Sequence, residues 1–184
     1  MQTIVVLLRG INVGGRNKIA MRDLQQTFAE LGFVEPTTFI QSGNVVAGSR
    51  KANGPAVVRT IERGLSDAFG YHARVVVLDL AQMKTVVRQI PKDWDVDDGS
   101  MRYNVIFTTA ALTPKELAKR VTPKLELEAV KAGTYALYWS APFATLTKTA
   151  MIKLSGHADY GELTIRNLRT TQKLLGLMQT HAAG

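Results

Sequence analysis

The chain has 184 residues, of which 46% are hydrophobic and 21% charged, a balance typical of a folded globular protein rather than a disordered one. It contains no cysteine, which excludes disulfide bonds, thiolate metal sites and thiol nucleophiles. Its 23 Lys and Arg residues outnumber its 15 Asp and Glu residues, and the resulting net charge of +8 favours anionic partners.

The first half of the chain predicts the element order β-α-β-β-α-β. The apolar run over 4–8 is too short for a signal-peptide core or a membrane span, so we expect a buried strand in a cytoplasmic protein with no membrane partner. The expected elements are a strand over 3–8, a helix over about 21–31, strands over 37–41 and 44–48 around a tight turn at Ser42-Gly43, a helix after Asn53-Gly54-Pro55, and a strand over 74–78. This order is that of a ferredoxin-like unit.

The second half nearly repeats this order. Thr113-Pro114-Lys115-Glu116 has the pattern of a capping box with proline at the first helical position, which makes Thr113 the expected N-cap. The expected elements are a connecting helix over 80–90 ended by Pro91, a strand over 103–109, the capped helix, a hairpin of 125–130 and 134–139, and helical segments near 147–154 and 166–178. We therefore predict an α+β protein of two ferredoxin-like halves in tandem, with antiparallel sheets and helices packed on one face: 1–79, a connecting helix and acidic linker over 80–100, and 101–184.

The segment from Leu7 to Lys18 runs from the first strand into a basic, glycine-rich loop. In a ferredoxin-like unit the first and third strands are antiparallel neighbours, so this loop should meet the turn over 41–44 at one end of the sheet. Backbone N–H groups around Gly14 and Gly15 would then form a nest that binds phosphate or carboxylate. The nearby cations are Arg9, Arg16 and Lys18.

A purely structural alternative explains the same residues. The glycines would provide positive φ angles, while Asn12 and Asn44 would hydrogen-bond the local backbone in turns. Further along the chain, Thr164 is expected to cap the last helix, with Arg166 in its first turn. Arg166 would either tie that helix to an acid or a carbonyl, with Asn167 anchoring a loop, or add a bidentate donor to the anion site. The candidate ligand-binding residues are therefore Arg9, Asn12, Gly14, Gly15, Lys18, Gln41, Ser42, Asn44, Arg166 and Asn167.

Three long segments resemble a known family. They are 7–18 with Met21 and Leu24, then Leu31-Gly32-Phe33 through the stretch 39–46, and finally Thr164-x-Arg166-Asn167 with Thr170 and Lys173-Leu174. These segments are similar to those of the bacterial family called domain of unknown function 1697, and the resemblance spans nearly the whole chain. It implies duplicated ferredoxin-like halves and no established activity. The sequence departs from the family at Phe39, where tyrosine is frequent, at Ala47, where a larger residue is common, and at Leu168, where tryptophan often follows the Arg-Asn pair.

Several familiar sites are absent from the sequence. The loop lacks the spacing of a P-loop, and no G-x-G-x-x-G follows a strand. His72, His157 and His181 show no metal-ligand spacing and are expected at the surface. Ser42 lacks the nucleophile-elbow pattern. The acidic residues Asp93, Asp95, Asp97 and Asp98 do not complete a calcium loop and are expected to form a solvated linker. We therefore expect no metal and no cofactor.

The leading functional hypothesis is a binding protein for a small anionic or phosphate-bearing ligand. One alternative is nucleic-acid binding through phosphate contacts, which the basic charge permits but no aromatic platform on the strands supports. Another is an enzyme that uses Arg9, Lys18 and Arg166 to stabilise developing negative charge, for which the sequence offers no general base. The sequence assigns neither a reaction nor an oligomeric state.

Overall fold

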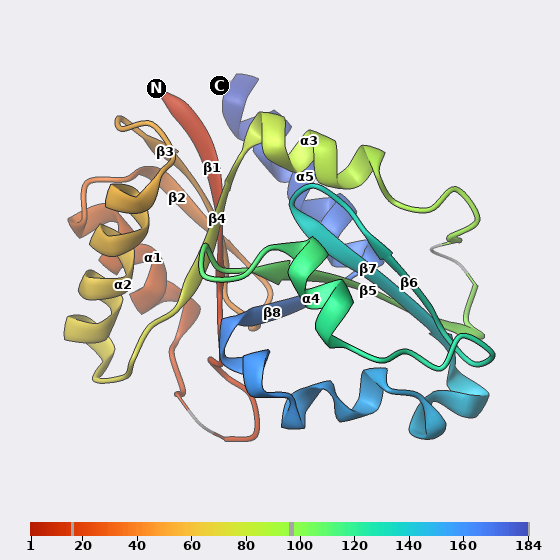
Figure 1. The fold of residues 1–184 in the computed structure, drawn as a ribbon. Coiled ribbons are helices and arrows are strands. Elements are labelled where there is room, and N and C mark those ends of the chain that lie inside the picture. The colour runs from red at the N-terminus through yellow and green to blue at the C-terminus, as the bar shows by residue number, and fades with distance from the viewer. Residues whose placement is uncertain (16, 96–97, 184) are drawn as a thin grey trace. The chain divides into compact units, whose positions relative to one another are not determined.

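The computed structural model describes residues 1–15, 17–95 and 98–183 and contains two four-stranded antiparallel sheets (Figure 1). The chain divides into two compact units, Met1–Met83 with Lys173–Gly184, and Lys84–Gln172. The division falls inside helix α3 (Leu80–Arg88) and inside helix α5 (Leu168–Ala183), so each helix contributes residues to both units. Residues 173–184 thus group with the first unit, whereas the sequence assigned them to the second half.

The first unit has the predicted β-α-β-β-α-β order. Its elements are β1 (Gln2–Leu8), α1 (Met21–Glu30), β2 (Val34–Phe39), β3 (Asn44–Ser49), α2 (Pro55–Phe69) and β4 (Val75–Asp79). The strands lie in the order β2-β3-β1-β4, and β1 pairs antiparallel with both β3 and β4. β2 begins before the predicted strand because Glu35, with φ +46°, and Pro36 form an irregular start that strand propensity does not anticipate.

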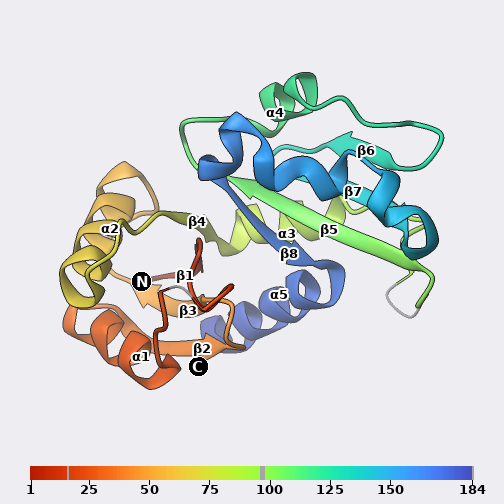
Figure 2. The same cartoon turned by 90° about the horizontal axis from the view of Figure 1, so that it is seen from below.

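Helices α1 and α2 cover one face of the first sheet (Figure 2). Alternate residues of β1 point toward these helices, because side chains of a strand alternate between its two faces. The fully or almost fully buried side chains of this core include Ile4, Val6 and Leu8 from β1, Leu24 and Phe28 from α1, and Ile61 and Leu65 from α2. α2 ends at Phe69 and is followed by Gly70, whose left-handed conformation is common at helix ends.

The second unit repeats the strand order of the first. Its further elements are β5 (Met101–Thr108), α4 (Pro114–Arg120), β6 (Ala129–Ala132), β7 (Ala136–Pro142), the 3-10 helices η1 (Phe143–Lys148), η2 (Met151–Gly156) and η3 (Ala158–Glu162), and β8 (Leu163–Asn167). The order β6-β7-β5-β8 matches β2-β3-β1-β4 strand for strand. Three short 3-10 helices therefore stand where a ferredoxin-like unit has its second α-helix.

The structure corrects three sequence predictions in these elements. Residues 163–167 are a strand and not the first turn of a helix, because they pair with β5, Ile165 lying opposite Ile106. The hairpin turn of the first unit spans residues 40–43 rather than Ser42-Gly43 alone, since Phe39 pairs with Asn44. The first strand of the second hairpin begins only at Ala129, after a turn over 124–128.

The buried carboxylate of Glu128 holds this turn against the rest of the second unit. It accepts hydrogen bonds from the backbone N–H groups of Lys124 (2.8 Å), Ala150 (2.7 Å) and Met151 (3.0 Å), and from the indole of Trp139 (2.7 Å). Burial would raise the pKa of Glu128, but these four donors outweigh it and hold the pKa below its ordinary value. A charged side chain thus joins the hairpin to the 3-10 segment.

None of the helices in the described part of the chain is long and apolar enough to cross a membrane. Asp97, one of the four acids of the predicted linker, lies outside the described residues. Of the other three, Asp93 and Asp95 are exposed, while the Asp98 carboxylate accepts hydrogen bonds from the backbone and hydroxyl of Ser100.

Candidate functional site

The glycine-rich loop over 9–20 is closed by the side chains of two asparagines. Asn12 donates from Nδ2 to the carbonyls of Ile19 and Gln41, both at 2.9 Å, and its Oδ1 accepts from the Ile19 N–H at 2.9 Å. Asn17 donates from Nδ2 to the Gly10 carbonyl at 2.8 Å. The bond from Asn12 to Gln41 confirms that the loop and the turn meet at one end of the sheet.

The turn opposite the loop is packed closely against it. The Leu8 N–H donates to the Gly43 carbonyl at 2.8 Å, and a Cβ placed on Gly43 would lie 2.7 Å from Cδ1 of Ile11. Gly43 also has a φ of +74°, so both the conformation and the space favour glycine there. Ile11 and Ile19 are almost fully buried in the core of the first unit, which anchors both ends of the loop.

Asn12 and Asn44 hydrogen-bond the local backbone, as the structural alternative predicts. Both N–H donors and the oxygen of the Asn12 amide are already used within the loop and turn. Asn44 is fully buried and donates from Nδ2 to the Phe39 carbonyl (2.9 Å) and to the Ser42 hydroxyl (3.1 Å). The structural alternative therefore applies to these two residues. Gln41 is exposed and offers its carbonyl to Asn12, so only its side chain stays available.

The outer part of the loop is open to solvent. Gly14 and Gly15 are exposed and have positive φ angles of +59° and +76°. Lys18 is exposed and Arg9 is half-buried, with the Arg9 N–H bonded to the Arg74 carbonyl at 3.0 Å. Arg16, the third predicted cation, lies outside the described residues. Successive residues with such backbone angles are typical of anion-binding nests.

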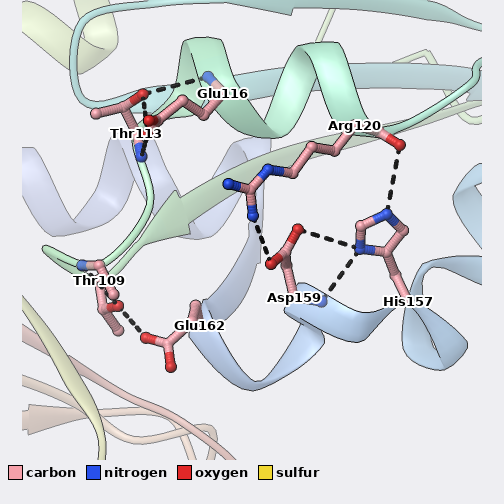
Figure 3. Close-up of polar contacts among 8 residues, drawn as sticks. Thr109, Thr113, Glu116, Arg120, His157, Asp159 and Glu162 are labelled. Carbon is pink, nitrogen blue, oxygen red and sulfur yellow. Dashed lines mark hydrogen bonds and ion pairs between the residues drawn. The ribbon is translucent and has the colours of Figure 1, made fainter.

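Helix α1, which follows the loop, begins without a side-chain cap. Its N-cap residue is Ala20, which has no hydrogen-bonding side chain. The topologically equivalent helix α4 is closed by the predicted capping box, in which Thr113 Oγ1 accepts from the Glu116 N–H at 3.2 Å and Glu116 accepts from the Thr113 N–H at 2.8 Å (Figure 3). The connection from the first strand to the first helix therefore ends in a capped helix in the second unit and in a helix without a side-chain cap in the first.

Arg166 and Asn167 lie on strand β8 of the second unit. The Arg166 guanidinium is buried and donates from Nη1 to the Thr164 hydroxyl and to the Ile165 carbonyl, both at 2.8 Å, and burial lowers its pKa to about 10. Asn167, rather than Thr164, caps α5, because its Oδ1 accepts from the Thr170 N–H at 2.8 Å. Their participation in the loop site stays a prediction.

Two of the three histidines are only partly exposed. His72 is exposed, but His181 is half-buried with Nδ1 3.3 Å from the Thr3 hydroxyl, and His157 is half-buried beside Asp159. The sequence pattern does not predict the surroundings of His157, because these depend on where the 3-10 helices place their side chains. Within the described ranges, no group of three or more His, Asp and Glu residues is arranged to hold a metal ion.

Comparison with protein families gives a match to a family of unknown function. The model described as "Protein of unknown function (DUF1697)" covers residues 1–138. The chain belongs to this family. The matched region contains the whole glycine-rich loop and the turn over 40–43, together with β1 to β6. No curated protein matches the chain.

The fold of this DUF1697 member is similar to a solved structure, that of conserved bacterial protein SP0830 from Streptococcus pneumoniae. The two sequences are 27% identical, and the alignment covers 96% of this chain and 98% of that one with a TM-score of 0.85. The strand-for-strand repeat of two sheets thus agrees with the duplication that the family resemblance implies.

Proposed function

We propose that this DUF1697 protein binds a small anionic, phosphate-bearing ligand at the glycine-rich loop over 9–20. The observation that carries the proposal is the contrast between two equivalent strand-to-helix connections. The connection over 109–113 is short and ends in a capping box, whereas the connection over 9–20 leaves α1 without a side-chain cap and presents Gly14 and Gly15 to solvent.

An uncapped helix start is a suitable place for an anion. The first N–H groups of a helix lack partners within the helix, and the helix dipole adds a partial positive charge there. Lys18 and Arg22 add exposed positive charge, while Asp23 in the first turn of α1 opposes it. Phosphates bind to helix N-termini preceded by glycine-rich loops for these reasons.

The side-chain hydrogen bonds of Asn12 and Asn17 hold the loop in its conformation before any ligand binds. Asn12 and Asn17 hold the backbone on both sides of Gly14 and Gly15. A preformed loop avoids the entropy loss of ordering on binding, which raises affinity for a small ligand. In this proposal Asn12 supports the loop, and the N–H groups and cations contact the ligand.

Titration of the isotope-labelled full chain with inorganic phosphate tests the proposal. We expect saturable shifts of the Gly14 and Gly15 amide resonances, and we expect Lys18→Ala to weaken binding by about tenfold, the size of one charge-assisted hydrogen bond. Lys51→Ala removes an exposed lysine outside the loop and should leave binding unchanged. Unsaturable shifts, or equal weakening by both variants, would contradict the proposal.

The same variants separate this function from nucleic-acid binding. A single-stranded oligonucleotide should bind no more tightly per phosphate than inorganic phosphate does. If it binds far more tightly, with affinity falling steeply as salt rises and with Lys51→Ala also weakening it, the partner is nucleic acid rather than a small ligand.

A further inference from the structure

The second unit contains a solvent-open pocket of about 480 Å³ between α4 and the 3-10 segment over 150–157. Its wall is apolar at Val121, Ala150 and Leu154, and Trp139 lies at its base. Its polar lining is Arg120, Thr122, Lys153 and His157. Of the described residues that line it, none is acidic. A volume of this size with a few convergent polar groups is typical of a small-molecule site.

Asp159, behind the lining, orients two of these polar residues (Figure 3). Its Oδ1 accepts from Nη1 of Arg120 at 2.9 Å, and its Oδ2 lies 3.6 Å from Nδ1 of His157. The Asp159 backbone N–H also points to Nδ1 of His157 at 3.2 Å, and because an N–H can only donate, Nδ1 accepts. The tautomer with its proton on Nε2, which lies 3.4 Å from the Arg120 carbonyl, fits both contacts.

The charge of the pocket corresponds to one negative charge on a ligand. Arg120 and Lys153 are positive and Asp159 is negative, so these three side chains together carry a net charge of +1. Lys153 is exposed, and its ammonium group makes no hydrogen bond or ion pair to another described residue. Arg120 uses Nη1 on Asp159 and keeps further guanidinium N–H groups directed away from that carboxylate. These donors suit a planar monoanion.

We infer that this pocket binds a small monocarboxylate with an apolar body. The carboxylate would contact Lys153 and the remaining donors of Arg120, while the apolar body would lie against Val121, Ala150 and Leu154. A phosphate dianion matches the pocket less well, because Asp159 already offsets the charge of Arg120 and leaves Lys153 as the one lining cation without a carboxylate among the described residues. This site lies within the second unit and shares no residue with the glycine-rich loop.

Benzoate is the probe that combines both features, and the labelled full chain reports where it binds. We expect saturable shifts of the Trp139 indole resonance and of the amides over 153–157, with the Gly14 and Gly15 amides unmoved. Acetate has only the charged group and benzyl alcohol only the apolar ring, so each should bind at least about tenfold more weakly. Equal binding of benzoate and benzyl alcohol would overturn the inference.

Two matched variants test the charge contact. Lys153→Ala should weaken benzoate binding by about tenfold, and Lys153→Arg should restore most of it, because one charge-assisted hydrogen bond is involved. Lys119→Ala removes an exposed lysine from the same turn of α4 as Arg120, outside the pocket lining, and should leave binding within about twofold of the original. An equal effect of Lys153→Ala and Lys119→Ala would show non-specific attraction and overturn the assignment.

Discussion

Asn12 is the residue on which the geometry of the loop depends most. Its amide makes three hydrogen bonds, and its φ of +53° lies in the left-handed region that asparagine tolerates better than most residues. Sequence reasoning placed Asn12 in the loop and weighed a structural role for it, but could not show which carbonyls it binds. That information depends on how the turn at Gln41 approaches, which is a long-range property of the sheet.

We predict that Asn12→Ala lowers the free energy of unfolding by about 2–3 kcal/mol, because the backbone N–H and carbonyl of the buried Ile19 lose these partners and the positive φ strains alanine. Asn12→Gly removes the same hydrogen bonds but tolerates the positive φ, so it should cost less. Urea unfolding of both variants measures the two effects. An unchanged midpoint for Asn12→Ala would show that water replaces the three bonds without penalty.

The lowered pKa of Glu128 leads to a prediction of how the free energy of unfolding depends on pH. Its pKa is lower in the folded protein than in the unfolded chain, so its stabilising contribution is present above its ordinary pKa and is lost as pH falls through the lowered value. Glu128→Gln should reduce stability at neutral pH by about 1–3 kcal/mol, because the amide meets several N–H donors with only one acceptor. Glu128→Gln should also make the free energy of unfolding fall less steeply as the pH decreases.

The neighbouring Glu126 provides the control for this prediction. It is exposed, so Glu126→Gln removes the same charge without touching the buried hydrogen bonds. Urea midpoints measured from pH 3 to pH 7 should fall in parallel for the original chain and Glu126→Gln, and less steeply for Glu128→Gln. Identical slopes in all three proteins would mean that other groups control acid unfolding.

At the scale of elements, short sequence patterns correctly predicted the helix features that depend on interactions between residues close in sequence. The capping box at Thr113 and the helical spacing of α1 each act within one or two turns, and the structure confirms them. Strand β8 was missed because its pairing partner β5 lies far away in sequence, and because α5 follows it directly. Long-range pairing decides the conformation of such a short segment.

The start of α1 carries a prediction that joins stability to binding. Ala20 has the extended backbone angles of an N-cap, φ −69° and ψ 138°, so Ala20→Asp should supply the missing acceptor and raise stability by about 1 kcal/mol. The same carboxylate would occupy the helix start and weaken phosphate binding there. Thermal unfolding and phosphate titration of one variant measure both effects. Higher stability with unchanged binding would separate the ligand from the helix terminus.

On the scale of the whole molecule, duplication explains how two units with one strand order carry different features. The sheets match strand for strand, yet one unit has a long loop and two α-helices, and the other has a capped turn and three 3-10 helices. The sequence predicted the duplication from the order of elements. It did not predict the pocket beside His157, because irregular 3-10 segments leave no periodic pattern.

The end of α5 offers a test of how the chain is divided. Leu174 and Met178 are fully buried and belong to the first unit, where His181 also contacts Thr3. Deleting residues 173–184 should therefore reduce hydrogen-exchange protection mainly in β1 to β4. Leu174→Ala should do so more mildly, at a cost of about 2–5 kcal/mol, and Gln179→Ala, an exposed change in the same helix, should not. Equal loss of protection in β5 to β8 would contradict the division.

The two isoleucines that flank the glycine-rich loop determine how a ligand would arrive. Because Ile11 and Ile19 are part of the hydrophobic core, opening the loop would require apolar side chains to leave that core. A ligand should therefore meet a surface that is already in its final shape, and the association rate should be set by diffusion and charge. Variants that keep the charge of the contacting cations would then differ mainly in how long the complex lasts.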